Sequence, residues 1–212
     1  RYAAGYIGSS MRVLMVGRWP ETAMRRHIDW ALEAGFAVCA ADFYAYDPRY
    51  QPDACATVSL LPGTPETQRR CFPHLAAEAT QRVAALRLQR LIKQFRPDVV
   101  HSYLLTPYTE LCLRVGARPL VVSVWSQLSA LLVSSTSRVE RQWVRRLRAG
   151  AAQVLVENPN LQTVLAGLPG PALPVQCIPL GVDVTRFHPG YRETAAAWRF
   201  VLGIPDGARV VF

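Results

Sequence analysis

Short apolar runs alternate with amphipathic stretches along most of this chain of 212 residues. The first apolar run, residues 12–16, predicts a buried strand, and residues 21–34 predict a helix that ends at Gly35. A second buried strand is expected over residues 36–41. A strand, a helix and another strand in this order open a doubly wound α/β fold, in which parallel strands share one sheet.

The same alternation continues toward the carboxyl end. Residues 76–96 predict the longest helix, because one face is apolar and the opposite face carries arginine and lysine, and Pro97 ends it. Residues 44–73 predict mostly loop, since they are rich in Pro, Asp and Gly, with a short strand at 56–61. The other expected helices are 107–115, 138–148, 159–166 and 193–202, and the other expected strands are 98–102, 120–125, 153–156 and 175–178.

The domain organisation follows from this order of elements. We expect an amino-terminal Rossmann-like α/β domain over residues 11–178, with a parallel sheet and helices on both faces. Residues 1–10 precede the first strand and are predicted to be a disordered extension. Residues 179–190 are interpreted as a hinge and residues 191–212 as the start of a second domain. The final strand, from Ala208, is predicted to be unpaired or donated to a neighbour.

Composition narrows the class of protein. Half of the residues are hydrophobic, so the chain can bury a sizeable core. No apolar run reaches the roughly 18 to 20 residues of a transmembrane helix, which favours a soluble, cytoplasmic protein. The five cysteines form no Cys-x-x-Cys pair, so neither a disulfide framework nor a metal site is expected. Cys39, Cys112 and Cys177 lie in apolar runs and are predicted to be buried.

The formal charge of +9 comes almost entirely from arginine, since Lys93 is the only lysine. A basic surface attracts polyanions. The chain nevertheless has no zinc-finger spacing, aromatic RNA-binding signature or basic zipper, so nucleic acid is not an expected partner. The expected helix at 138–148 carries five of the arginines and one glutamate. It is either a basic amphipathic helix that lies on an anionic membrane at the inner face, or a packed helix whose polar side is arginine.

The stretch 177–189 has the composition of an ordered crossover between two domains. Pro179 fixes φ and ends a strand, Gly181 allows a backbone conformation that a β-carbon would forbid, and Asp183 can hydrogen-bond to its own turn. The alternative is an ordinary Pro/Gly loop before a helix. Upstream lie Arg-Pro-Asp-Val-Val-His at 96–101, a strand into Trp125, and Glu-Asn after the strand at 153–156.

These motifs, in this order, resemble those of the family 4 glycosyltransferases of GT-B fold. The resemblance covers residues 11–212. It implies two doubly wound domains that face each other across a cleft: the carboxyl-side domain binds a nucleotide-diphosphate sugar, and the amino-side domain shapes the acceptor site. It also implies transfer of a hexose to a carbohydrate or lipid-linked acceptor with retention of configuration, without a metal or cofactor. The present chain, truncated just inside the donor domain, is then expected to be inactive alone.

The resemblance also suggests site residues. His101 is expected at the carboxyl end of a strand, as a candidate catalytic residue, and the alternative is a core histidine. Gly17 and Arg18 are candidates for the loop that holds the donor phosphates, because backbone N–H groups before a helix bind anions. Trp19-Pro20 stands where the family typically has a Gly-Gly pair. The alternative is that Gly17 simply ends a strand and Arg18 is solvated.

The acceptor would lie against residues that follow two later strands. Trp125 is a candidate for stacking on an apolar sugar face, or it packs at the strand end, and Ser126 follows it. Glu157 and Asn158 would reach the same edge, although Asn158 is also a suitable cap for the next helix. Two other functions stay open for the chain: a nucleotide-sugar epimerase of the same fold, and a non-catalytic α/β module that binds polyanions or serves as a scaffold.

Overall fold

The chain divides into two units, Arg1–Ile178 and Pro179–Phe212. The computed structural model describes residues 11–18, 22–44, 55–71, 74, 77–103, 105–124, 145–167, 172–179, 181, 192–205 and 208–209.

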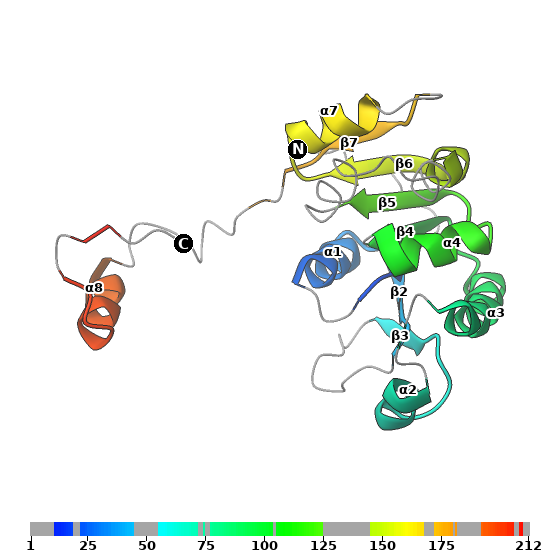
Figure 1. The fold of residues 1–212 in the computed structure, drawn as a ribbon, viewed down its shortest axis with the longest axis horizontal. Coiled ribbons are helices and arrows are strands. Elements are labelled where there is room, and N and C mark those ends of the chain that lie inside the picture. The colour runs from blue at the N-terminus through cyan, green and yellow to red at the C-terminus, as the bar shows by residue number, and fades with distance from the viewer. Residues whose placement is uncertain are drawn as a thin grey trace. The chain divides into compact units, whose positions relative to one another are not determined.

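The first unit is built around one sheet, in which every described pair of neighbouring strands is parallel (Figure 1). Its spatial order is β3-β2-β1-β4-β5-β6-β7, so the chain begins in the middle, runs to one edge and then returns to build the other side. This order confirms the predicted doubly wound fold. The strands are β1 (Arg12–Val16), β2 (Ala37–Asp42), β3 (Ala56–Ser59), β4 (Val99–Tyr103), β5 (Leu120–Val124), β6 (Ala151–Val156) and β7 (Val175–Cys177).

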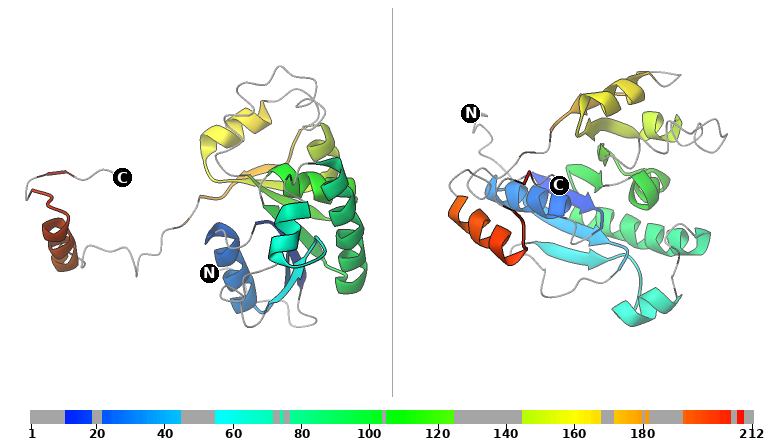
Figure 2. Two further views of the ribbon diagram at one scale, coloured as in Figure 1. Left: turned by 60° about the horizontal axis from the view of Figure 1, so that its bottom comes forward. Right: turned by 60° about the vertical axis from the view of Figure 1, so that its left-hand side comes forward.

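Helices cover both faces of the sheet, as predicted (Figures 1 and 2). One face is covered by α1, and the other by α3, α4 and a short helix at residues 145–150, while α7 packs on the edge strands β6 and β7. The described helices of this unit are α1 (Thr22–Glu33), α2 (Pro65–Cys71), α3 (Glu78–Phe95), the π-helical turn η2 (Leu105–Thr109), α4 (Glu110–Arg114), residues 145–150, and α7 (Pro159–Ala166).

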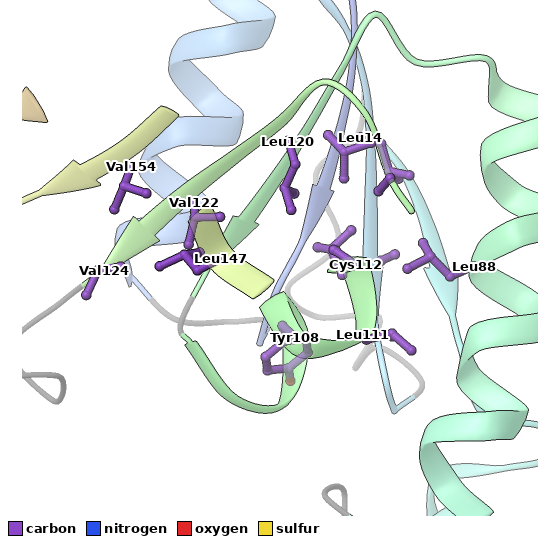
Figure 3. Packing of buried hydrophobic residues seen from close by; sticks show 14 of the residues in the cluster. Leu14, Leu88, Tyr108, Leu111, Cys112, Leu120, Val122, Val124, Leu147 and Val154 are labelled. Carbon is purple, nitrogen blue, oxygen red and sulfur yellow. The ribbon is translucent and has the colours of Figure 1, made fainter. Parts of the chain in front are cut away.

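Strand β1 shows how the sheet is buried on both sides. Successive side chains of a strand point to opposite faces. Leu14 therefore packs in the larger hydrophobic cluster, with Leu88 of α3 and residues of α4, β5 and β6 (Figure 3). Met15 packs on the other face, in a smaller cluster with Met24 and Ile28 of α1. Burial on both faces explains why the strands are continuous apolar runs instead of alternating ones.

The helix boundaries follow local signals that the sequence contains. Gly35, with φ of 78°, follows α1 in the left-handed conformation that glycine adopts most easily. Helix α3 buries Ala84 and Leu88 while Arg90 and Lys93 are exposed, which confirms its predicted faces. It ends at Arg96, whose φ of 49° is left-handed and directly precedes a proline.

The prediction of a loop over residues 44–73 is wrong at Pro65–Cys71, which forms α2. This helix has a proline at its first position, where no backbone donor is lost, and the Thr64 hydroxyl accepts a hydrogen bond from the Thr67 N–H. Among its described side chains the buried one is polar: Gln68 donates from its side chain to the Ser59 hydroxyl and the Leu61 carbonyl. An amphipathic apolar pattern is therefore absent, and periodicity could not find the helix.

Two cysteine predictions are confirmed and one is only partly met. Cys39 and Cys112 are fully buried, and burial raises the pKa of each thiol to about 12. Cys177 is half-buried and packs at the edge of the larger cluster. All five thiols are free, Cys55 being buried and Cys71 exposed. The buried thiols act as small apolar groups, because the unreactive neutral form is favoured there.

The second unit contains α8 (Arg192–Val201). Arg199 donates to the Ala208 carbonyl, which ties the residues after α8 back to the helix. Ala208 and Arg209 pair with no strand, and residues 210–212 lie outside the described part, so the final unpaired strand stays a prediction. Most of the predicted hinge also lies outside it and stays a prediction.

The arginine-rich helix predicted over residues 138–148 is described only from residue 145, and it extends to residue 150. Leu147 is fully buried, whereas Arg145 and Arg146 are exposed. This part of the helix therefore packs one apolar side chain on the sheet and presents arginine to solvent. Across the described segments, the structure contains no helix with the length and apolar character that crossing a membrane requires.

Candidate functional site

The carboxyl edge of the sheet is where open α/β folds bind ligands. Gly17 follows β1 at this edge, Asp42 ends β2, and Tyr103 ends β4. Glu157 and Asn158 follow β6. The structure thus brings several of the predicted residues to one edge, together with others that the sequence analysis did not single out.

Beneath this edge, a chain of hydrogen bonds links four side chains. We call these four side chains the His–Tyr–Ser network. The Nδ1 atom of His27 on α1 lies 2.9 Å from the Tyr103 hydroxyl. The same hydroxyl lies 3.1 Å from Nδ1 of His101, and Nε2 of His101 lies 2.8 Å from the Ser123 hydroxyl. The network therefore connects α1, β4 and β5 through side chains alone.

The protons of this network are coupled. The Tyr103 hydroxyl has one proton and three neighbours that could accept it: Nδ1 of His27, Nδ1 of His101 and the sulfur of Met15 at 3.7 Å. At least one of the two imidazoles must therefore donate its N–H to this hydroxyl. The tautomers of His27 and His101 are consequently linked. The ring of His101 stacks at 5.8 Å from that of His27 and lies 4.3 Å from the Tyr103 ring.

Burial keeps the network uncharged at neutral pH. Desolvation, with a smaller contribution from the neighbouring His27, lowers the pKa of His101 to about 3. Burial also lowers the pKa of His27 and raises the pKa of Tyr103 well above its usual value. At neutral pH the network can accept or donate hydrogen bonds, but its histidines carry no charge.

His101 was expected at the carboxyl end of a strand. The strand β4 continues to Tyr103, so His101 lies two residues before its end. Both of its ring nitrogens have hydrogen-bond partners, Tyr103 and Ser123. This arrangement is the one expected of the core-histidine alternative. A catalytic role of His101 stays a prediction.

Gly17 has a packing role that the sequence did not reveal. A β-carbon at Gly17 would lie 2.8 Å from Cβ of Tyr103 and 2.9 Å from the sulfur of Met24, closer than side chains pack. Glycine is therefore needed for α1 to close over Tyr103. The Gly17 N–H donates to the Ala41 carbonyl at 3.0 Å, so it is not available to a phosphate. In the predicted phosphate loop, Arg18 is exposed and residues 19–21 lie outside the described part.

Asp42 is a further residue at this edge that the sequence analysis missed. It is buried at the end of β2, and its carboxylate accepts a hydrogen bond of 2.8 Å from the Tyr108 hydroxyl. The Tyr108 ring packs edge-on against Phe43. The sequence signal that could have identified it is an aspartate directly after an apolar run. A carboxylate at such a position is expected to be buried, and a buried carboxylate requires a polar partner. Among the described residues, no group of three or more His, Cys, Asp or Glu side chains could hold a metal ion.

The predicted acceptor residues are described only in part. Asn158 caps α7: its side-chain oxygen accepts a hydrogen bond of 2.8 Å from the Leu161 N–H, as the capping alternative predicted. Glu157 is half-buried beside it. A role of either residue in acceptor binding stays a prediction. Trp125 and Ser126 lie outside the described residues.

Gly181, in the predicted hinge, does not have the conformation expected of it. Its φ is not in the left-handed region, and a β-carbon there would meet open space. The reason given for glycine at this position is therefore wrong, since other residues could adopt the same backbone. Asp183 lies outside the described residues.

Solved structures share the fold of this chain at low sequence identity. Sucrose-phosphate synthase from Thermosynechococcus elongatus has a TM-score of 0.57 and 15% identity, over 92% of this chain and 53% of that one. A shorter form of the same synthase gives 0.56 and 13%, over 91% and 99%. A glycosyltransferase from Rickettsia africae gives 0.58 and 9%, over 95% and 52%.

These identities support a likeness of fold alone. The chain spans about half the length of the longer synthase structure and of the Rickettsia structure. No curated protein matches it. The sequence profile described as Glycosyltransferase Family 4, however, matches residues 35–186, which is well over half of the chain. On this match, the chain belongs to glycosyltransferase family 4.

Proposed function

We propose that this chain is the acceptor-side domain of a retaining hexosyltransferase that uses a nucleotide-diphosphate sugar as donor, without a metal or cofactor. The observation that carries the proposal is the family match over residues 35–186, which lies almost entirely within the parallel-sheet unit. The donor would bind mainly to a second domain. A carbohydrate or lipid-linked acceptor would lie at the carboxyl edge of the present sheet.

In this proposal the residues of the edge have different tasks. The exposed Arg18, next to the tightly packed Gly17, is the charged group that would approach the donor phosphates. His101, uncharged at neutral pH, would act as a hydrogen-bonding group and not as an acid. Trp125, Ser126, Glu157 and Asn158 would contact the acceptor, with Asn158 also holding the start of α7.

Acceptor-dependent release of nucleoside diphosphate tests the proposal. The full-length enzyme that contains this chain is incubated with a panel of nucleotide-diphosphate sugars, with and without candidate acceptors. A transferase releases nucleoside diphosphate and forms a new glycoside only when acceptor is present, and NMR of the product gives its anomeric configuration. Conversion of the donor without acceptor would favour an epimerase, and binding without turnover would favour the non-catalytic alternative.

The role of His101 can be separated from packing in the same enzyme. His101→Ala is expected to lower turnover more than it lowers the melting temperature, if the imidazole contacts substrates through the edge of the sheet. Ser123→Ala is the matched control, because it removes the partner of Nε2 and leaves the imidazole. Losses of activity that only parallel losses of stability would assign His101 to the core.

We also propose that the protein is cytoplasmic and attaches peripherally to anionic membranes through the arginines of residues 138–148. In support, the described part of this helix exposes Arg145 and Arg146. Leu147 packs on the sheet, as the packed-helix alternative expects, so only the arginine face is available to a membrane. Basic side chains near an anionic surface contribute about 1 kcal/mol each before screening by salt. A lipid-linked acceptor would then be presented to an enzyme that already lies at the membrane.

A further inference from the structure

A recess lies at the amino ends of β5 and β6, at the opposite edge of the sheet from the His–Tyr–Ser network. It has a volume of about 440 Å³. Arg118 lines it two residues before β5 begins, and Gly150 lines it directly before β6. Arg114 and Arg146 contribute from α4 and from the helix at residues 145–150, which lie on the same side of the sheet (Figure 2). We call this feature the arginine recess.

Helix α4 and the end of the helix at residues 145–150 approach each other closely at the recess, because residue 150 is a glycine. A β-carbon at Gly150 would overlap with the side chain of Leu113 on α4. The Ala149 carbonyl, one residue earlier, accepts a hydrogen bond of 3.0 Å from Nη2 of Arg118. This bond fixes one guanidinium against the end of the neighbouring helix, so that the recess is partly preorganised.

The recess has more cationic than anionic groups. It is lined by three arginines against one carboxylate, that of Glu110. Arg114 forms two further hydrogen bonds, of 2.7 and 2.9 Å, to the carboxylate of Glu78 on α3. These bonds, together with Arg82, lower the pKa of Glu78 to about 2, so it stays ionised. Arg146, by contrast, has no hydrogen bond or ion pair with any residue that the structure describes.

Such an arrangement suits a phosphate group. A guanidinium presents several planar N–H donors that match phosphate oxygens, and the one described contact of Arg118 uses only one of them. We propose that the arginine recess binds the phosphate group of a phosphorylated ligand, either a soluble phosphate ester or a lipid headgroup. This site is separate from the proposed sugar transfer, since it lies at the amino edge of the strands.

Calorimetric titration of the chain with inorganic pyrophosphate at low salt tests the proposal. Arg146→Gln is expected to weaken binding about fivefold, because it removes a charge-assisted contact at an exposed site. Arg90→Gln on α3 is the matched control, since it makes the same charge change on an exposed helix position outside the recess. Neither substitution should alter the melting temperature. Binding that weakens equally in both variants would overturn the proposal.

Vesicle co-sedimentation separates the two sources of the phosphate. If the ligand is a headgroup, phosphatidylglycerol vesicles bind the chain, phosphatidylcholine vesicles do not, and Arg118→Gln, which lies in the recess but outside residues 138–148, releases it while Arg90→Gln does not. If the ligand is soluble, the titration with pyrophosphate responds to Arg118→Gln and the vesicles do not. Absence of an Arg118-dependent effect with both probes at low salt would show that the recess binds no phosphate.

Discussion

The two units of this chain bury their apolar side chains to very different degrees. In the first unit, Leu88 of α3 is fully buried in a cluster that spans the sheet and its helices. In the second, Trp198 and Phe200 of α8 are 61% and 88% exposed. Both helices are amphipathic, so the difference does not lie in their own patterns. In the first unit strands cover the apolar face, whereas the described residues of the second unit include no strand, and a helix alone cannot bury its apolar face.

Truncation of a core side chain should give the largest contrast between the units. Leu88→Ala is expected to lower the free energy of unfolding by about 2 to 5 kcal/mol, because it leaves a cavity among packed neighbours. Phe200→Ala should change it by less than about 0.5 kcal/mol, since the ring is already in water. Urea denaturation of both variants measures the difference. Comparable losses would show that α8 belongs to a core that the described residues do not reveal.

A pair of glycine substitutions sharpens the same contrast. Gly17→Ala should cost about 1 to 3 kcal/mol, because the new methyl group meets Tyr103 and Met24 at less than van der Waals distance. Gly181→Ala, in the second unit, meets open space at an ordinary φ and should be neutral or slightly stabilising. Thermal denaturation compares them. A stable Gly17→Ala protein would mean that α1 can move away from the sheet easily.

Acid should destabilise the first unit through the desolvated imidazole of His101. The pKa of His101 is about 3 in the folded chain and about 6.5 when unfolded, so the unfolded state binds the extra proton between these values. The contribution to stability is present above about pH 6.5 and is lost as the pH falls toward 3, by at most about 1.4 kcal/mol per pH unit. His101→Asn should flatten this dependence, because it removes the group that titrates between these values. An unchanged slope in His101→Asn would contradict the burial of the imidazole.

The smallest effect concerns the arginines of residues 138–148. Arg141→Gln together with Arg145→Gln should reduce co-sedimentation with phosphatidylglycerol vesicles. The remaining binding should fade as the salt concentration rises to the physiological range, where the Debye length is roughly 8 Å. Arg90→Gln with Lys93→Gln removes two exposed charges from α3 and is the control. The hypothesis would be contradicted if binding survived both high salt and the two substitutions, or if no binding occurred at low salt. In either case these arginines would be an ordinary solvated face.

The order of elements in the first unit could be predicted because its signals are local. β1 and α7 were predicted with the observed bounds, since an apolar run and a proline at the first helical position define them. Helix α2 could not be predicted in this way. Its buried side chain is the amide of Gln68, and the partners of that amide lie on a different segment. Local periodicity contains no information on such contacts.

The candidate site was predicted less well than the fold. His101 was singled out, but its partners His27, Tyr103 and Ser123 come from three elements whose proximity depends on the order of strands in the sheet. Tyr103 could have been found, because residues two apart on a strand share one face. His27 and Ser123 could not, since the sequence alone does not specify which helix covers which strands.

The acceptor-side assignment is tested most directly by the Michaelis constants of the two substrates in the full-length enzyme. Trp125→Ala is expected to raise the KM for the acceptor about fivefold, which corresponds to the ~1 kcal/mol of a good aromatic contact, and to leave the KM for the donor unchanged. A higher KM for the donor with an unchanged KM for the acceptor would contradict the account, because the present domain would then hold the nucleotide sugar.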